Sequence, residues 1–113
     1  MIRGYGGGRF RIAGETYEGS VLVFAERTLP WPVTEAAEVT PRSLEEATGA
    51  AERPDILLVG CGPRFVAEPA GLRAALREAG AVLEWMDTGA ACRTFNVLLA
   101  EDRRAAAALI AVE

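Results

Sequence analysis

The sequence contains no histidine and no lysine, and these absences exclude several kinds of chemistry. Histidine is the side chain that most often transfers protons near neutral pH, and it is the commonest metal ligand. Without lysine the chain can form no Schiff base and cannot supply the lysine of a phosphate-binding loop. Two cysteines alone cannot provide the four ligands of a Cys/His zinc site. We therefore expect no metal and no cofactor, and a role without catalysis is favoured over an enzyme.

Long apolar runs and positive net charge are also absent. The longest apolar runs are too short to cross a bilayer, and the chain does not begin with a charged and then apolar leader. The net charge of −4 gives no overall attraction to nucleic acid or anionic lipid. These features predict a cytoplasmic protein that binds no nucleic acid and does not insert into a membrane. In that reducing compartment we expect Cys61 and Cys92 to be free thiols.

The residues that are present have ordinary globular composition, half apolar and a quarter charged over 113 residues. This length predicts a single domain, 1–113. The first part of the chain is typical of β-structure. We expect a flexible glycine-rich lead-in at 4–8, a hairpin formed by the segments 9–12 and 16–24, and an edge strand at 28–33, where Trp31 stands between two prolines.

The rest of the chain alternates between helical and extended patterns. Helices are predicted from Thr40 to about Ala51, from Pro69 to Gly80, and from Thr88 onward, with Ser43 and Glu46 as a capping box in the first. Strands are predicted at 56–59, 82–86 and 109–112, although the run 105–108 would also suit a continued helix. This order predicts an α/β fold with three layers: a central mixed β-sheet with helices and an added N-terminal β-hairpin layer.

Two loops follow the predicted strands 56–59 and 82–86 and contain the best candidates for a binding site. In open α/β sheets, ligands bind beyond the carboxyl ends of strands, where helix N-termini favour anions. The arginines and helix amides there could converge on a small anion, unless the arginines are solvated or paired with Glu84 or Glu101. The residues expected at this rim are Gly60, Cys61, Gly62, Arg64, Asp87, Thr88, Gly89 and Arg93.

Nucleotide binding at the first loop is a weaker hypothesis. Gly60 and Gly62 form part of a dinucleotide-binding fingerprint, and Glu84 lies about the right distance onward to meet a ribose. However, Phe65 replaces the third glycine and Pro63 removes an N–H donor. A tight turn that needs glycine for its backbone conformation is the favoured interpretation.

The second loop, Asp87-Thr88-Gly89-Ala90, has the sequence of the active-site motif of retroviral-type aspartic proteases. In those proteases the motif lies near the amino end and precedes many strands. Here it lies late in the chain and begins a helical apolar stripe, so we expect Asp87 or Thr88 to cap a helix.

The two cysteines allow a further alternative. If the strands 56–59 and 82–86 are parallel neighbours, Cys61 and Cys92 lie at the same rim, and the first helical turn would lower the pKa of Cys92. That arrangement would permit a redox pair. The favoured alternative is that both are buried cysteines that fill contacts between helix and sheet.

Motifs along nearly the whole chain resemble those of one known family. The most specific block runs from Met86 to Leu98 and continues in Glu101-x-Arg103-Arg104. The weaker parts are Gly4-Tyr5-Gly6, Phe10-x-Ile12-x-Gly14, Tyr17-x-Gly19-Ser20-Val21-Leu22-Val23, Trp31 and Leu57-Leu58-x-Gly60-x-Gly62. Together they resemble the uncharacterised α/β domain family shared with mitochondrial complex I assembly factor 3. The resemblance implies a three-layer α/β fold and a role in assembling a membrane-bound NADH dehydrogenase, with no established catalysis.

Taken together, these features favour a binding or assembly protein with a protein partner, and they leave a homo-oligomer open. This hypothesis predicts an exposed apolar patch around Tyr5, Trp31 and Trp85. The alternative is an anion- or nucleotide-binding protein, or an enzyme, that uses the rim of Gly60–Arg64 and Asp87–Arg93. That alternative predicts a concave pocket with convergent polar groups at the rim.

Overall fold

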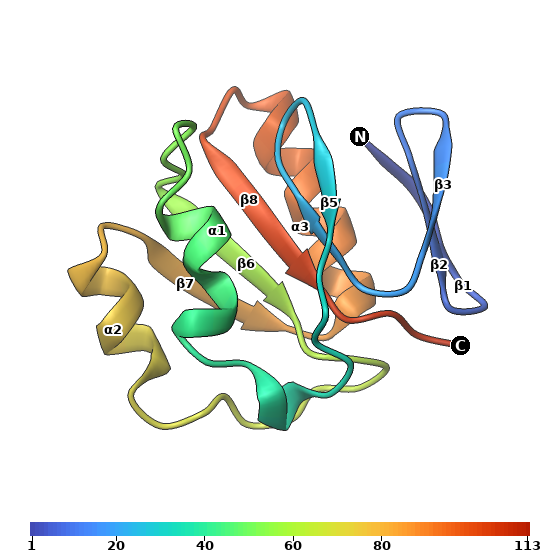
Figure 1. The fold of residues 1–113 in the computed structure, drawn as a ribbon. Coiled ribbons are helices and arrows are strands. Elements are labelled where there is room, and N and C mark those ends of the chain that lie inside the picture. Colours follow the sequence, from blue (N-terminus) through green and yellow to red (C-terminus); the bar gives the residue numbers. More distant parts are fainter.

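The computed structural model describes all residues, 1–113, and arranges them in two sheets with helices packed around them (Figure 1). The three-stranded antiparallel sheet contains β1 (Ile2–Gly6), β2 (Arg9–Ile12) and β3 (Glu15–Glu18). The five-stranded sheet has the order β5-β4-β8-β6-β7 and contains β4 (Val21–Val23), β5 (Thr28–Pro30), β6 (Ile56–Gly60), β7 (Val82–Met86) and β8 (Ala105–Leu109). The helices are η1 (Ala36–Glu38), η2 (Arg42–Leu44), α1 (Glu45–Thr48), α2 (Leu72–Glu78) and α3 (Thr88–Ala100).

The five-stranded sheet is mixed and is covered on both faces. Strand β6 is parallel to β7 and β8, whereas β4 is antiparallel to β5 and β8. Helices α1 and α2 cover one face, and α3 and the three-stranded sheet lie on the other (Figure 1). Side chains of β6 alternate between the two cores, since Leu57 and Val59 belong to the first and Leu58 to the second. The predicted three-layer α/β fold with a central mixed sheet is therefore confirmed.

The amino-terminal layer contains one strand more than the predicted hairpin. Residues 4–6 of the lead-in expected to be flexible belong to β1, which pairs with β2. The predicted strand at 16–24 is interrupted at Gly19, where φ is 80°. Because this left-handed conformation breaks an extended strand, β3 and β4 belong to different sheets. The predicted edge strand at 28–33 is present as the shorter β5.

The segment 40–51 is helical over a shorter length than predicted. The Thr40 amide donates to Ser43 Oγ at 3.0 Å, and the Ser43 amide donates to Thr40 Oγ1 at 3.1 Å. The predicted capping box of Ser43 and Glu46 was therefore wrong, because the hydroxyl and the amide of Ser43 are both hydrogen-bonded to Thr40. The helix predicted from Pro69 begins at Leu72 and stops before Gly80, whose φ is 93°, as expected for a glycine that ends a helix.

The carboxyl-terminal strand consists mainly of alanines, a composition that favours a helix in isolation. Asp102, with φ of 59°, reverses the chain after α3. The five residues of β8 are all buried between β4 and β6, where small side chains fit under two covering layers. A strand at the end of the chain was predicted correctly, but it occupies 105–109 rather than 109–112. None of the helices combines the length and apolar character needed to cross a membrane.

Candidate functional site

The carboxyl ends of β6, β7 and β8 meet at one edge of the sheet, and Thr88 links them. Its hydroxyl accepts a hydrogen bond from the Gly62 amide at 3.1 Å and donates one to the Ile110 carbonyl at 2.8 Å. The Thr88 amide also donates to the Gly62 carbonyl at 2.9 Å. Thr88 is fully buried. This residue, predicted to contact a ligand, therefore has its hydrogen-bonding groups occupied within the protein.

Gly60 is required because the end of β6 and the start of α3 approach each other closely. A Cβ atom at Gly60 would lie 2.8 Å from Thr88 Cα and 3.0 Å from Thr88 Oγ1. These distances are too short for non-bonded atoms, so any side chain here would push α3 away from β6. Gly62 has a positive φ of 120°, which supports the predicted need for glycine in this turn.

The amino end of α3 is capped by Asp87, as predicted. Asp87 Oδ1 accepts a hydrogen bond from the Ala90 amide at 2.9 Å. The next position, Gly89, lies under the Tyr5 side chain, since a Cβ at Gly89 would meet the Tyr5 hydroxyl at 2.5 Å. The Tyr5 side chain thus covers part of the first turn of α3.

The two cysteines do not form a pair. Cys61 belongs to the core beneath α1 and α2, and Cys92 belongs to the core beneath α3 on the opposite face of the sheet. Burial raises the pKa of Cys92 to about 12, although Arg93 acts to lower it. The predicted lowering of this pKa was wrong because loss of solvation outweighs the favourable charge and helix position. A redox pair formed by these thiols does not fit this arrangement.

Arg64 and Arg93 are the two arginines predicted at the rim, and both are exposed. Neither forms an ion pair, whereas Arg9, Arg27, Arg73 and Arg104 do. The alternative of pairing with Glu84 or Glu101 is therefore not seen. Binding of an anion by the two rim arginines remains a prediction.

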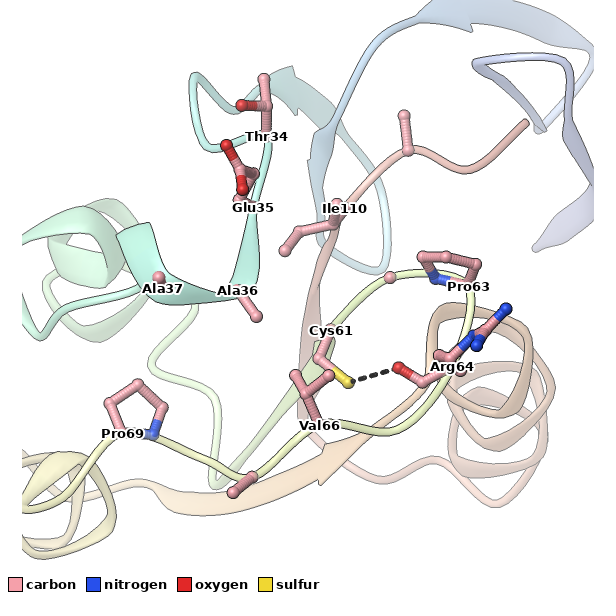
Figure 2. Close-up of a pocket in the computed structure, with 13 residues that line it drawn as sticks. Thr34, Glu35, Ala36, Ala37, Cys61, Pro63, Arg64, Val66, Pro69 and Ile110 are labelled. Atoms are coloured by element: carbon pink, nitrogen blue, oxygen red, sulfur yellow. Dashed lines mark hydrogen bonds between the residues drawn. The ribbon is translucent and has the colours of Figure 1, made fainter.

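A groove of about 810 Å³ lies beside the rim and is lined by two segments that are distant in sequence (Figure 2). One wall comes from residues 34–37, which precede and begin η1, and the other from residues 61–69 after β6. Ile110 lies between the two walls (Figure 2). Of the predicted rim residues, Cys61, Gly62 and Arg64 line this groove. The other five do not: Gly60, Asp87, Thr88, Gly89 and Arg93.

The wall formed by residues 34–37 is held by Glu38. Its carboxylate accepts hydrogen bonds from the amides of Thr34 and Glu35, at 2.8 and 3.1 Å, and from the Thr34 hydroxyl at 3.2 Å. These donors lower the pKa of Glu38, the Thr34 amide having the largest effect. The ionised carboxylate thus fixes this wall at neutral pH.

The second wall is formed by residues 61–69 and is called the 61–69 loop. It has no regular secondary structure, but side-chain contacts fix it. The Trp85 indole donates to the Val66 carbonyl at 2.6 Å, and the Cys61 thiol donates to the Arg64 carbonyl at 3.6 Å. Arg73 pairs with Glu68 at 2.8 Å. These contacts hold the loop in one conformation although it lies on the surface.

The exposed apolar surface differs from the predicted one. Trp31 and Trp85 are buried, and each indole N–H donates to a backbone carbonyl, so only Tyr5 of the expected patch is exposed. The most exposed large apolar side chain is instead Phe65, at 64%, followed in sequence by Val66, at 41%. In the sequence, Phe65 was noted only as the residue that replaces the third glycine of a dinucleotide-binding fingerprint. The sequence signal that could have identified this exposed surface is a pair of large apolar residues, Phe65 and Val66, in a segment without helical or strand periodicity.

Comparison with known proteins connects this arrangement to a family. The model of a family described as protein of unknown function (DUF498/DUF598) matches residues 2–110. The chain belongs to this family. An uncharacterized protein of Rhodobacter capsulatus is 39% identical over 96% of this chain and 82% of its own length. The family resemblance predicted from the motifs is therefore confirmed.

Family relatives in animals carry a functional name. NADH dehydrogenase [ubiquinone] 1 alpha subcomplex assembly factor 3 of Xenopus tropicalis is 34% identical over 97% of this chain and 60% of its own length. The human protein of that name is 31% identical over 96% of this chain and 59% of its own length. The chain thus spans about three-fifths of the length of these assembly factors.

Several solved structures share the fold of this chain. The crystal structure of a Bartonella henselae protein, described as an outer membrane protein, has a TM-score of 0.89 and 38% identity, covering 99% of this chain and 94% of that one. The NMR structure of a Rhodopseudomonas palustris protein has a TM-score of 0.85 and 41% identity, covering 99% of this chain and 83% of that one.

Proposed function

We propose that this family member is a protein-binding module that acts in the cytoplasm during assembly of a multi-subunit complex, without a catalytic role of its own. Its animal relatives are named as assembly factors for NADH dehydrogenase, which supports an assembly function. The observation that carries the proposal is the exposure of Phe65 and Val66 on a fixed loop beside the groove.

Two physical arguments favour a protein partner at this surface. Burying an exposed large apolar side chain contributes about 1.5–3 kcal/mol. Phe65 and Val66 together could therefore supply much of the free energy of a contact, and aromatic residues often dominate such contacts. Because Trp85 and Arg73 already hold the loop, binding would lose little conformational entropy.

Site-specific photo-cross-linking in the native host tests this proposal. A photoreactive amino acid replaces Phe65 in one variant and Val97 in a control, since Val97 on α3 is similarly exposed at 55%. From position 65 we expect a discrete adduct with one partner protein, which mass spectrometry would identify and which would recur in repeated experiments. From position 97 we expect no adduct. Equal cross-linking at both positions, or no adduct at position 65, would contradict the proposal.

A second candidate is binding of a small anion at the rim, favoured by the absence of ion pairs at Arg64 and Arg93. Oxyanions such as phosphate pair readily with such guanidinium groups. We expect millimolar phosphate to raise the Tm of the wild-type protein, with loss of this increase in the double variant Arg64→Gln/Arg93→Gln. An unchanged Tm of the wild type would remove this candidate.

A further inference from the structure

The groove carries two opposite charges on its two walls. Glu35 lies on the wall of residues 34–37 and Arg64 on the 61–69 loop, and both side chains are exposed (Figure 2). Neither side chain takes part in an ion pair. The Ile110 side chain lies between the two walls (Figure 2), and the lining also includes the small or apolar residues Ala36 and Cys61. A ligand that matches this surface would be apolar in its middle and oppositely charged on its two flanks.

The backbone of the 61–69 loop favours an extended ligand. Among the loop residues that line the groove, Arg64, Val66 and Ala67 have N–H groups without a hydrogen-bond partner within the protein, although the Arg64 and Val66 carbonyls do have partners. An extended polypeptide has carbonyl groups that can accept from such donors, as in recognition by strand addition. A helical ligand has already used most of its backbone groups internally and could not pair with them.

We infer that the groove binds an extended segment of a partner protein, with apolar side chains in its middle, a basic residue beside Glu35 and an acidic residue beside Arg64. This inference rests on the proposed protein-binding function and specifies the chemistry of the segment. The groove volume of about 810 Å³ lies near the upper end of the roughly 300–1,000 Å³ range of small-ligand sites, which suits a short stretch of residues.

Selection from a displayed library of random linear peptides tests the inference with the full chain. The matched variants are Ala37→Trp, which places a large side chain in the groove from an exposed position, and the charge exchange Glu35→Arg/Arg64→Glu. All three substituted residues are solvent-exposed, so we expect wild-type thermal unfolding for both variants.

We expect the wild type to enrich peptides with an apolar middle flanked by one basic and one acidic residue. Ala37→Trp should weaken their binding at least about tenfold. The charge-exchanged variant should prefer peptides with the two charges exchanged, also by about tenfold. Absence of enrichment, enrichment unaffected by Ala37→Trp, or an unchanged charge preference in the exchanged variant would overturn the inference.

The two experiments separate this inference from the function on which it rests. A partner cross-linked at position 65 without any peptide enrichment would support the proposed function. The same result would overturn the extended-segment inference, because the partner would then bind through a folded surface. Peptide enrichment with the expected charges, but without cross-linking in the host, would support the recognition chemistry and contradict the assembly role.

Discussion

Cys92 shows how burial controls the chemistry of a single residue. Its thiol lies in the core beneath α3, and burial raises its pKa to about 12 from an ordinary value of 9.0. Above pH 9 the unfolded chain loses this proton while the folded chain retains it. The folded state therefore binds more protons, and the contribution of Cys92 to stability falls as pH rises from 9 to 12.

This linkage predicts a pH-dependent difference between the wild type and Cys92→Ala. The free energy of unfolding of the wild type, relative to that variant, should fall above pH 9 by up to about 1.4 kcal/mol per pH unit. Urea unfolding at a series of pH values measures the difference. A constant difference between wild type and Cys92→Ala from pH 8 to 11 would contradict the expected linkage.

The tryptophans show which residue-level features the sequence could not predict. Trp31 and Trp85 are large and amphipathic, so their types are compatible with either a surface patch or a core. Their burial depends on carbonyls of Ser43 and Val66, which are brought near only by the tertiary fold. By contrast, the cap at Asp87 depends on a residue three positions away, and this local feature was predicted correctly.

At the level of elements, Thr88 joins the loop after β6, the start of α3 and the end of β8. Replacing Thr88 with valine keeps the side-chain shape but leaves the buried Gly62 amide and Ile110 carbonyl without their hydroxyl partner. We expect Thr88→Val to lower the free energy of unfolding by about 1–3 kcal/mol. Thr88→Ser retains the hydroxyl and should lose less. Urea denaturation of both variants measures the effect, and equal losses would show that packing of the methyl group, rather than hydrogen bonding, stabilises this joint.

The element boundaries show where local pattern and tertiary packing disagree. The strands β6 and β7 were predicted close to their observed limits, and α3 was predicted from its observed start, because their apolar spacing and caps are local signals. The alanines of β8 prefer a helix in isolation, and only their position between β4 and β6 makes them a strand. A pocket at the rim was predicted only for the ligand-binding alternative, and its wall of residues 34–37 was not predicted, because residues 34–37 and 61–69 become neighbours only in the folded chain.

At the level of the whole molecule, Asn96 holds the three-stranded sheet against α3. Its side-chain oxygen accepts from the Ile2 amide, and its side-chain nitrogen donates to the Ile2 carbonyl, both at 2.8 Å. The amide side chain therefore bonds β1 in the way that a neighbouring strand would. Tyr5, over Gly89, provides a second contact between the same two elements.

Removing this attachment should loosen one sheet without unfolding the other. We expect Asn96→Ala to lower the free energy of unfolding by about 1–2 kcal/mol, since two hydrogen bonds are lost. Hydrogen exchange should become faster in β1 and remain nearly unchanged in β6 and β8. Val97→Ala, at an exposed position on the same helix, is the control. Uniformly faster exchange in both sheets would show instead that the molecule opens as one cooperative unit.

The central position of β8 has a consequence for how the protein is synthesised. This strand is made after every other strand, yet it lies between β4 and β6 and pairs with both. A nascent chain on the ribosome therefore cannot complete the five-stranded sheet before residues 105–109 have emerged. Until then the edges of β4 and β6 stay unpaired, and such edges promote association between chains. Translation that stops short of β8 should accordingly give products that aggregate or are degraded rather than a smaller folded domain.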